Sequence, residues 1–214
     1  MSPLVVNEIF HSMQGESSHM GRPCVFVRLT YCNLRCTYCD TEHAFYEGSS
    51  MEVDEVLQKV RSYRCNLVEI TGGEPLMHEG VYGLMAALCD QGYEVLLETG
   101  GSLDISRVDQ RVKRIMDLKC PSSGMLKKNL WTNIEHLRPT DEVKFVIGNR
   151  EDFDWSVETI RRYGLIDRCP VLMSVVFGVL EPVTLAEWIL ESGLNVRFQL
   201  QMHKYVWEPA TRGV

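Results

Sequence analysis

Several features are scarce in this 214-residue sequence, and each shortage excludes a class of protein. The longest mostly apolar stretch, residues 170–180, is too short to cross a bilayer and contains Ser174 and Gly178, so we expect no membrane partner. Basic residues are not in excess, because the net charge is −7, and we expect no nucleic-acid partner. The N-terminus has no basic stretch followed by an apolar run, so we expect no signal peptide.

Internal repeats, low-complexity stretches and linkers are also missing. Because 214 residues suffice for one full hydrophobic core, we predict a single domain over residues 1–214. Eight cysteines without a secretion signal indicate a reducing compartment, so we predict a cytoplasmic location. Five of these cysteines are dispersed, namely Cys24, Cys65, Cys89, Cys120 and Cys169, and most of them are expected to be small core residues.

Short aliphatic segments alternate with amphipathic ones along the chain. We predict strands at residues 25–30, 67–71, 93–98, 113–118, 142–147, 171–176 and 195–201. Helical spacing of apolar residues predicts two helices with the buried positions Val53, Val56, Leu57, Val60, Val81, Leu84, Met85 and Leu88. Gly92 is expected to follow the second helix in a left-handed conformation, and Thr184 with Glu187 indicates a capping box before a third.

This regular alternation predicts an α/β fold with a mainly parallel sheet, and about six strand–helix units predict a partial (β/α) barrel. Unusual motifs directly follow five of the strands: the cysteine-containing segment after Thr30, and residues 71–75, 98–102, 117–124 and 201–204. Chemistry in such sheets gathers at the C-terminal ends of the strands, so we expect these motifs to share one site. Gly72 and Gly73 would allow a close approach of the backbone to a ligand, or a positive φ.

The most informative motif is the spacing of Cys32, Cys36 and Cys39. A zinc site, or a cluster held only by cysteines, normally needs four protein ligands, and no fourth cysteine lies nearby in sequence. Three thiolates can instead hold three irons of a [4Fe–4S] cluster and leave the fourth iron open to a small molecule. The alternative is a zinc knuckle, for which His43 is the nearest fourth ligand.

A second motif, Gln14-Gly15-Glu16, precedes the cysteines. An amide that donates and accepts, beside a carboxylate that only accepts, suits the edge of a pterin or guanine ring, which displays an N–H, an amino group and a carbonyl. From these residues alone, a surface turn is the competing interpretation.

Taken together, the motifs resemble the 7-carboxy-7-deazaguanine synthase family of the radical S-adenosylmethionine (SAM) superfamily. The resemblance runs from about Asn7 to Lys204 and rests on residues 13–16, Arg28, residues 32–41, 71–75, 98–102 and 117–123, Lys144 and residues 201–204. The sequence departs from the family pattern at Ser17, where glycine is common, and at Gly100, where Asn or Ser is common.

The resemblance implies a radical SAM lyase that converts 6-carboxy-5,6,7,8-tetrahydropterin to 7-carboxy-7-deazaguanine with release of ammonia, in queuosine and 7-deazapurine biosynthesis. The implied cofactors are a [4Fe–4S] cluster on Cys32, Cys36 and Cys39, SAM on the open iron, and Mg²⁺ on Thr41. Cleavage of SAM would yield a radical that takes hydrogen from the pterin. The ring would then contract, hydrogen would return, and SAM would be regenerated.

The resemblance also implies which residues bind each group. Substrate contacts are expected from Met13, Gln14, Gly15, Glu16, Arg28, Thr99 and His203. SAM contacts are expected from Tyr38, Cys39, Asp40, Gly73, Glu74, Gly101, Lys119, Ser122, Ser123, Lys144 and Gln201. No residue is expected to be catalytic by itself, because the radical chemistry belongs to the cofactors. Ordinary roles compete at four positions. They are packing for Tyr38, a structural role for His203, a structural salt bridge for Arg28 and a turn or helix cap for Thr41.

Two rival functions are compatible with parts of the sequence. An activating enzyme that installs a glycyl radical on a partner protein would share the cluster and the SAM site, but residues 14–16 and Thr41 would have no role. A non-catalytic iron–sulfur or zinc-binding module would not need glycine motifs at successive strand ends. As partners we expect a flavodoxin or ferredoxin as electron donor, and a second copy in a homodimer, since a partial barrel leaves an open sheet edge.

Overall fold

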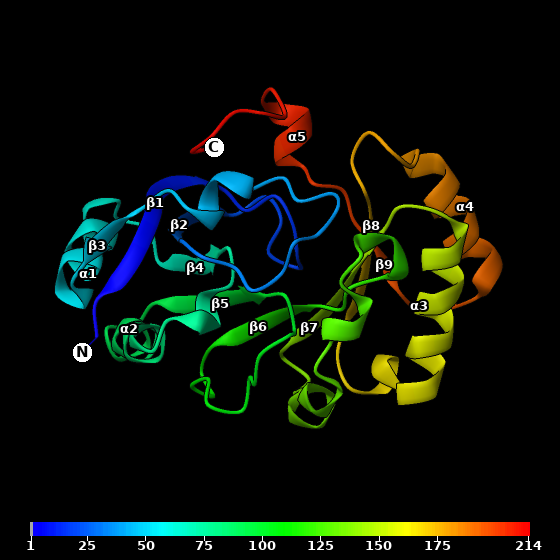
Figure 1. Cartoon of the computed structure of the whole chain (residues 1–214), viewed down its shortest axis with the longest axis horizontal. Coiled ribbons are helices and arrows are strands. Elements are labelled where there is room, and N and C mark those ends of the chain that lie inside the picture. The colour runs from blue at the N-terminus through cyan, green and yellow to red at the C-terminus, as the bar shows by residue number, and fades with distance from the viewer. Residues whose placement is uncertain (1) are drawn as a thin grey trace.

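The computed structural model of the chain describes residues 2–214 and contains one nine-stranded sheet with the order β3-β1-β2-β4-β5-β6-β7-β8-β9 (Figure 1). The strands are β1 (Leu4–Met13), β2 (Pro23–Leu29), β3 (Ser49–Met51), β4 (Leu67–Gly72), β5 (Glu94–Thr99), β6 (Lys113–Asp117), β7 (Glu142–Ile147), β8 (Val171–Val175) and β9 (Arg197–Phe198). The α-helices are α1 (Val53–Ser62), α2 (Gly80–Asp90), α3 (Arg150–Tyr163), α4 (Pro182–Ser192) and α5 (His203–Val206). Short 3₁₀ helices are η1 (Glu42–Phe45), η2 (Pro75–Met77), η3 (Pro121–Ser123), η4 (Leu126–Lys128), η5 (Trp131–His136) and η6 (Leu165–Asp167).

The parallel part of the sheet starts at β2. This strand pairs in parallel with β4, and each later strand pairs in parallel with the next, up to β9. The predicted parallel sheet is therefore confirmed. The last strand is shorter than predicted, because the chain beyond Gln199 leaves β8 and the Met202 N–H donates to the Gly15 carbonyl at 2.9 Å.

Strands β1 and β3 are absent from the sequence-based prediction. β1 runs antiparallel to β2 with Glu8 opposite Arg28, and β3 runs antiparallel to β1. Polar residues Asn7, Glu8 and His11 interrupt β1, and none of them is buried. β1 therefore lacks the continuous aliphatic run that marks strands buried on both faces.

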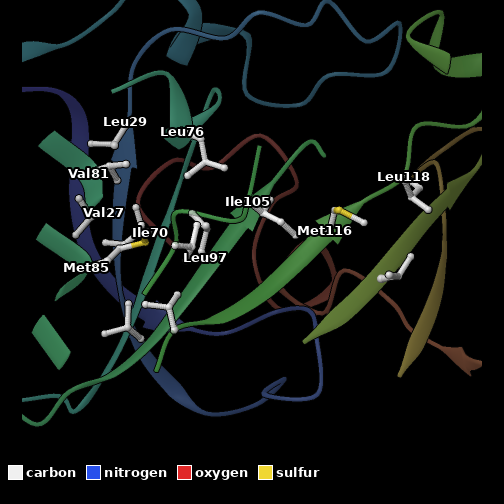
Figure 2. Packing of buried hydrophobic residues seen from close by; sticks show 14 of the residues in the cluster. Val27, Leu29, Ile70, Leu76, Val81, Met85, Leu97, Ile105, Met116 and Leu118 are labelled. Carbon is white, nitrogen blue, oxygen red and sulfur yellow. The ribbon is translucent and has the colours of Figure 1, made fainter. Parts of the chain in front are cut away.

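One face of the sheet carries the main hydrophobic core. Successive side chains of a strand point to opposite faces, and one set packs against α1, α2, α3 and α4. Figure 2 shows Val81 and Met85 of α2 in the same cluster as Ile70 of β4 and Leu97 of β5. The apolar positions predicted for α1 and α2 are all buried.

The ends of two helices test the capping predictions. Gly92, just beyond α2, has a φ of +84°, which confirms the expected left-handed conformation. The capping box predicted at Thr184 is wrong. α4 begins at Pro182 and its N-cap position is Glu181. A proline in the first turn is favoured because its fixed φ suits a helix and its missing N–H is not needed there.

The opposite, inner face of the sheet has two layers. A small apolar layer consists of Cys24, Phe26, Leu67, Leu96 and Ile115. Nearer the C-terminal ends of the strands, the same face carries polar side chains, namely Arg28, Thr71, Glu98 and Asp117, together with Lys144 of β7. The alternation of the strands thus places charged groups where the loops begin.

The C-terminal segment lies close to these strand ends. Figure 1 shows α5 and the last residues (red) on the same side of the sheet as the loop that follows β2 (light blue). Among residues 2–214, no helix has the length and the apolar character that crossing a membrane requires.

Candidate active site

A cavity of about 830 Å³ opens at the C-terminal ends of the strands. Its walls come from the cysteine loop (residues 30–41), the turn at residues 14–16, the ends of β4 to β7, the start of α5 and the C-terminal residues 209–214. This volume lies within the usual range for sites that bind small molecules and cofactors.

The cysteine loop is anchored to the end of β4 by backbone contacts. Gly73 N–H donates to the Leu29 carbonyl at 3.2 Å, and Glu74 N–H donates to the Tyr31 carbonyl at 2.7 Å. A Cβ at Gly73 would lie 1.9 Å from the Tyr31 oxygen, so any side chain there would displace the loop. The close approach predicted for the glycine pair is thus made to the chain's own backbone.

Arg35 stabilises the conformation of the same loop. Its guanidinium donates to the carbonyls of Cys32 at 2.7 Å and Leu34 at 2.6 Å, and it lies 4.2 Å from the centre of the Phe45 ring. A positive charge over an aromatic face is an attractive arrangement. The loop conformation around Cys32 is therefore set by protein groups.

Ser122 and Ser123 hold the loop at Thr37. The Thr37 hydroxyl donates to the Ser122 carbonyl at 2.7 Å, and the Thr37 N–H donates to the Ser123 carbonyl at 3.1 Å. The side chain of Ser122 bonds to Asp152, and that of Ser123 donates to the Cys120 carbonyl at 2.6 Å. Both hydroxyls thus already have protein partners.

Cys32, Cys36 and Cys39 all line the cavity. Among the described residues, no three His, Cys, Asp or Glu side chains are gathered closely enough to hold one metal ion. A [4Fe–4S] cluster does not need such a gathering, because each cysteine binds a different iron, whereas zinc needs its ligands around one centre. The Nε2 atom of His43 lies 3.8 Å from Glu8 Oε1. This donor set fits a cluster better than zinc.

Glu74 is fully buried and organises the end of β5. Its carboxylate accepts from the Thr99 hydroxyl at 2.9 Å, from Gly100 N–H at 2.7 Å and from Leu76 N–H at 3.1 Å. Burial raises the pKa of Glu74 even though these bonds favour the charged form. Gly101 follows with a φ of +67°, a conformation that glycine adopts without strain.

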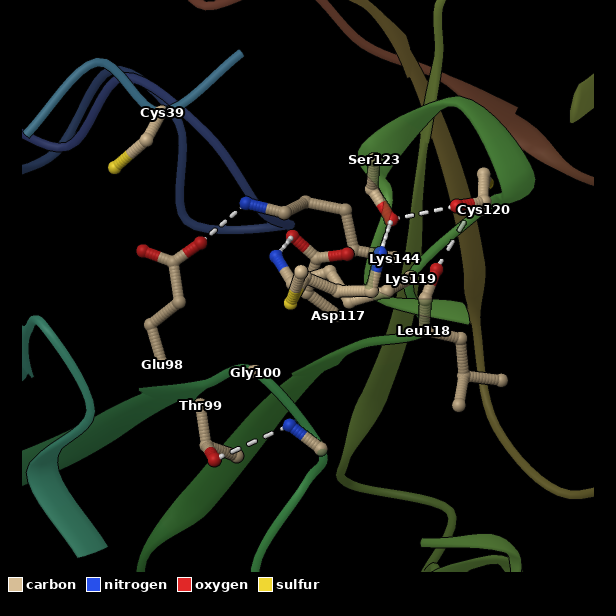
Figure 3. Close-up of polar contacts among 12 residues, drawn as sticks. Cys39, Glu98, Thr99, Gly100, Asp117, Leu118, Lys119, Cys120, Ser123 and Lys144 are labelled. Atoms are coloured by element: carbon tan, nitrogen blue, oxygen red, sulfur yellow. Dashed lines mark hydrogen bonds and ion pairs between the residues drawn. The ribbon is translucent and has the colours of Figure 1, made fainter. Parts of the chain in front are cut away.

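Asp117 and Lys119 form an ion pair in the cavity wall. Lys119 Nζ lies 2.7 Å from Asp117 Oδ2, as Figure 3 shows, and burial of Lys119 is outweighed by this carboxylate, so that the lysine pKa is raised. In the cavity lining, two buried oxygens have no hydrogen-bond partner within residues 2–214, namely Asp117 Oδ1 and the Tyr38 hydroxyl. Unpaired buried polar atoms in a cavity wall favour a polar ligand there, and they lie where the resemblance expects SAM.

Glu16 sits at the centre of a charged network. Its carboxylate accepts from Lys144 Nζ at 2.8 Å and from Gln201 Nε2 at 2.9 Å. Burial acts to raise the pKa of Glu16, but Lys144 and these bonds outweigh it and lower that pKa. Lys144 also pairs with Glu98 (Figure 3), and the two carboxylates hold the pKa of Lys144 well above its usual value despite burial. Glu16 therefore carries a negative charge at the cavity wall.

His203 and Gln201 bring the C-terminal segment to the same wall. A Cβ at Gly15 would lie 2.2 Å from His203 Nδ1, so the imidazole packs directly on the glycine. Burial lowers the pKa of His203, which favours the neutral ring.

Asp40 accepts from Lys204 Nζ at 2.7 Å and from Gln201 Nε2 at 3.4 Å. Burial opposes the charged form of Asp40, but Lys204 lowers its pKa to about 2.

Arg28 forms the salt bridge that the sequence analysis weighed as an alternative to substrate binding. Arg28 Nε donates to Glu8 Oε1 at 2.7 Å, and the guanidinium carbon lies 5.7 Å from the centre of the Phe10 ring. Within residues 2–214 its two terminal nitrogens have no hydrogen-bond partner, and Arg28 lines the cavity. The salt bridge thus orients Arg28 and leaves it able to meet a carboxylate.

Thr41 occupies the N-cap position of η1, but its hydroxyl makes no capping bond. Its Oγ1 instead lies 3.8 Å from Cys39 Sγ, and Thr41 lines the cavity. The hydroxyl is therefore available beside the predicted cluster.

The structure gathers most of the predicted site residues. All seven predicted substrate contacts line the cavity, whereas the predicted SAM contacts Gly101, Ser122 and Ser123 lie outside its lining. Glu8, Glu69, Glu98 and residues 209–214 also line the cavity, and the sequence analysis assigned no contact to any of them. A charged residue inside an otherwise apolar strand, as at Glu69, is a signal that could have been read.

The model of the radical SAM superfamily matches residues 27–181, so fold and site together define a radical SAM protein. The chain is 47% identical to 7-carboxy-7-deazaguanine synthase from Chlorobaculum tepidum, across 100% of this chain and 98% of that protein. It is 42% identical to the 7-carboxy-7-deazaguanine synthase of Koribacter versatilis, across 98% of this chain and 99% of that protein. The chain therefore belongs to the 7-carboxy-7-deazaguanine synthase family.

The fold is similar to that in the crystal structure of QueE from Escherichia coli, with a TM-score of 0.79 over 94% of this chain and 95% of that chain. The two sequences are 21% identical, so this likeness concerns the fold alone. It agrees with the partial barrel predicted from the strand–helix alternation. Membership of the radical SAM superfamily implies a [4Fe–4S] cluster and SAM as cofactors.

Proposed function

We propose that this protein converts 6-carboxy-5,6,7,8-tetrahydropterin to 7-carboxy-7-deazaguanine with release of ammonia, a step in queuosine and 7-deazapurine biosynthesis. The observation that carries the proposal is that residues 14–16, Arg28 and His203 line the same cavity as the three cysteines. These substrate candidates come from the turn after β1, from β2 and from α5. Because the chain belongs to the 7-carboxy-7-deazaguanine synthase family, we interpret their convergence as a binding site for that family's substrate.

The cluster and SAM, when bound, supply an organic radical that abstracts hydrogen from the substrate. Cys32, Cys36 and Cys39 would hold the cluster, with Asp117 and Tyr38 among the groups that face SAM. What this chain contributes is position, charge and the exclusion of water.

The substrate would be bound by two charged groups of the cavity lining. Glu16, held ionised by Lys144, would accept hydrogen bonds from the N–H and amino groups of the pyrimidine edge. Arg28, held by Glu8 through Nε, would present its terminal nitrogens to the substrate carboxylate. The imidazole of His203, packed on Gly15 and favoured in its neutral form, would complete the cavity wall beside Glu16.

Mg²⁺ belongs to the proposal as a third cofactor, with Thr41 as its protein ligand. The support is the position of the Thr41 hydroxyl, which lines the cavity without capping η1. Mg²⁺ commonly binds through few protein ligands and fills its octahedron with water and substrate oxygens. The substrate carboxylate beside Arg28 would supply such oxygens.

The proposal also includes the setting in which the enzyme works. None of the eight cysteines, all of which lie within residues 2–214, forms a disulfide, which supports a reducing cytoplasm. An electron donor of the flavodoxin or ferredoxin type is needed to reduce the cluster. We also propose that the protein forms a homodimer and that residues 1–214 form a single domain.

The test is anaerobic reconstitution of the cluster, followed by an assay with carboxytetrahydropterin, SAM, Mg²⁺ and a reductant. We expect formation of 7-carboxy-7-deazaguanine and of equimolar ammonia, with many turnovers for each SAM. Cleavage of SAM without consumption of the pterin would reject the proposal and favour the glycyl-radical activating enzyme. The absence of any SAM cleavage would favour a non-catalytic module.

A further inference from the structure

Glu69 is a carboxyl group within the apolar layer of the inner face. It lies on β4 with Phe26 of β2 and Leu96 of β5 as its register partners, and it is 3% exposed. Burying a carboxyl costs free energy unless it is hydrogen-bonded. An apolar side chain would fill this position without that cost, so we look for the polar group that the carboxyl contacts.

The partner of Glu69 is Gln14. Within residues 2–214, the one hydrogen bond to the Glu69 carboxyl comes from Gln14 Nε2. The other amide atom, Gln14 Oε1, accepts from Glu16 N–H at 2.8 Å. The Gln14 backbone is also paired, because its N–H donates to the Arg22 carbonyl and its carbonyl accepts from Gly21 N–H, each at 2.8 Å. Glu69 thus supplies the contact that ties the side chain of Gln14 to the sheet.

The charges around Glu69 suit this contact. Glu16 of the turn and Glu98 of β5 face it, as do Lys144 of β7 and Arg28 of β2. Burial, together with repulsion from the two carboxylates, raises the pKa of Glu69 well above its usual value despite the two cations. The neutral acid adds no further negative charge beside Glu16, and its carbonyl oxygen accepts the Gln14 bond.

We propose that Glu69 is a positioning residue for substrate recognition, which acts through Gln14 to hold residues 14–16 in the shape that faces the substrate ring. The inference rests on the proposed function for the identity of that substrate. A turn that is fixed before binding loses less conformational freedom on binding, so Glu69 would contribute affinity without touching the substrate.

The kinetic test compares Glu69→Leu with Glu69→Gln in the reconstituted enzyme. Leucine fits the apolar layer but removes the partner of Gln14, whereas glutamine keeps a carbonyl acceptor. We expect Glu69→Leu to raise KM for the pterin by about 5- to 150-fold, with kcat, cluster content and SAM affinity close to wild type. Glu69→Gln should restore most of the affinity. Glu158→Leu, at an exposed glutamate of α3, controls for the loss of a carboxylate as such.

A double variant separates action through Gln14 from any other effect. If Glu69 acts through Gln14, then Gln14→Ala should raise KM much less in the Glu69→Leu background than in wild type. Fully additive effects would overturn the proposal. A wild-type KM in Glu69→Leu would also overturn the proposal. Misfolding of this variant, or a joint loss of the cluster and of SAM affinity, would overturn it as well, because either result would indicate a merely structural role.

A measurement without the pterin keeps this inference separate from the proposed function. Hydrogen exchange of SAM-loaded holoenzyme should show faster exchange at residues 14–21 in Glu69→Leu than in wild type, with Glu69→Gln near wild type. Unchanged exchange in Glu69→Leu would reject the positioning role even if the enzyme turns over the pterin. Failure of wild-type enzyme to use the pterin would reject the proposed function, while the exchange result would still decide the role of Glu69.

Discussion

The imidazole of His203 packs on Gly15 so closely that a Cβ at residue 15 would lie 2.2 Å from His203 Nδ1. Two bonds accompany this contact, from Met202 N–H to the Gly15 carbonyl and from Gln201 Nε2 to Glu16 Oε1, each at 2.9 Å. The segment after the last strand is therefore bonded to the turn after the first strand. Together they form one wall of the cavity.

The contact predicts the effect of Gly15→Ala. The added methyl group should displace the His203 ring and weaken pterin binding by about 10- to 100-fold, because small misplacements in a site are costly. Cluster content should stay normal, since the three atoms nearest to the added Cβ all belong to His203. In a His203→Ala background the same change should cost little. An equal cost in both backgrounds would show that Gly15 acts independently of the ring.

The cysteines divide into two functional groups. Changing Cys32, Cys36 or Cys39 to Ala should abolish SAM cleavage, because each thiolate holds one iron of the cluster. Cys65→Ala and Cys89→Ala should retain a cluster with normal absorbance and iron content. An essential cysteine outside the loop would contradict the assignment of the open iron.

The magnesium proposal depends on the hydroxyl of Thr41. Thr41→Val removes this hydroxyl and nearly keeps the shape, so turnover should fall and its dependence on Mg²⁺ should weaken, with cluster content unchanged. Thr41→Ser, which keeps the hydroxyl, should respond to Mg²⁺ like wild type. An unaltered Mg²⁺ response in Thr41→Val would leave the residue with a local role in its loop.

A buried charge cluster outside the site should govern stability. Asp141, fully buried, accepts bonds from Arg114, itself 3% exposed, and from Arg138 Nη2 at 2.9 Å. Asp141→Ala leaves these cations unpaired and should cost about 3–5 kcal/mol of unfolding free energy. Denaturation with urea, followed by tryptophan fluorescence, measures this loss. Asp141→Asn should cost less.

The same aspartate gives a pH dependence with a defined sign. Burial opposes the charged form, but the hydrogen bonds from Arg114 and Arg138 outweigh it and lower the pKa of Asp141. Its contribution is therefore present at neutral pH and is lost as the pH falls below about 4, through the folded-state pKa. The difference in stability between wild type and Asp141→Asn should shrink in that range. A difference that stays constant with pH would contradict this account.

The parallel strands could be predicted because each is an aliphatic run bounded by glycine or polar residues. β1 could not, because its alternation of polar and apolar residues reflects its place at the cavity and near the sheet edge, which depends on tertiary structure. Thr184 was mistaken for a helix start, although Pro182 has a local preference for the first turn of a helix.

The site shows a similar division. The motifs at the strand ends indicated where the site lies. They did not indicate which of its polar groups already have hydrogen-bond partners within the protein. Glu74 and Thr99 are bonded to each other, and the pair Arg28 and Glu8 is visible only once β1 lies beside β2. Glu69 carries no motif, and its partner Gln14 lies on a distant turn. Pairings of this kind depend on strand register, which the sequence alone does not specify.

The central claim is that residues 14–16 recognise a pterin, and calorimetry of SAM-loaded holoenzyme with carboxytetrahydropterin tests it most directly. We expect wild type to bind, and Glu16→Ala and Gln14→Ala to bind about 5- to 150-fold more weakly, with intact cluster spectra and SAM affinity. Glu16→Ala should be the weaker of the two, because its carboxylate makes charge-assisted bonds. Wild type that fails to bind the pterin, or variants that bind it as tightly as wild type, would contradict the account.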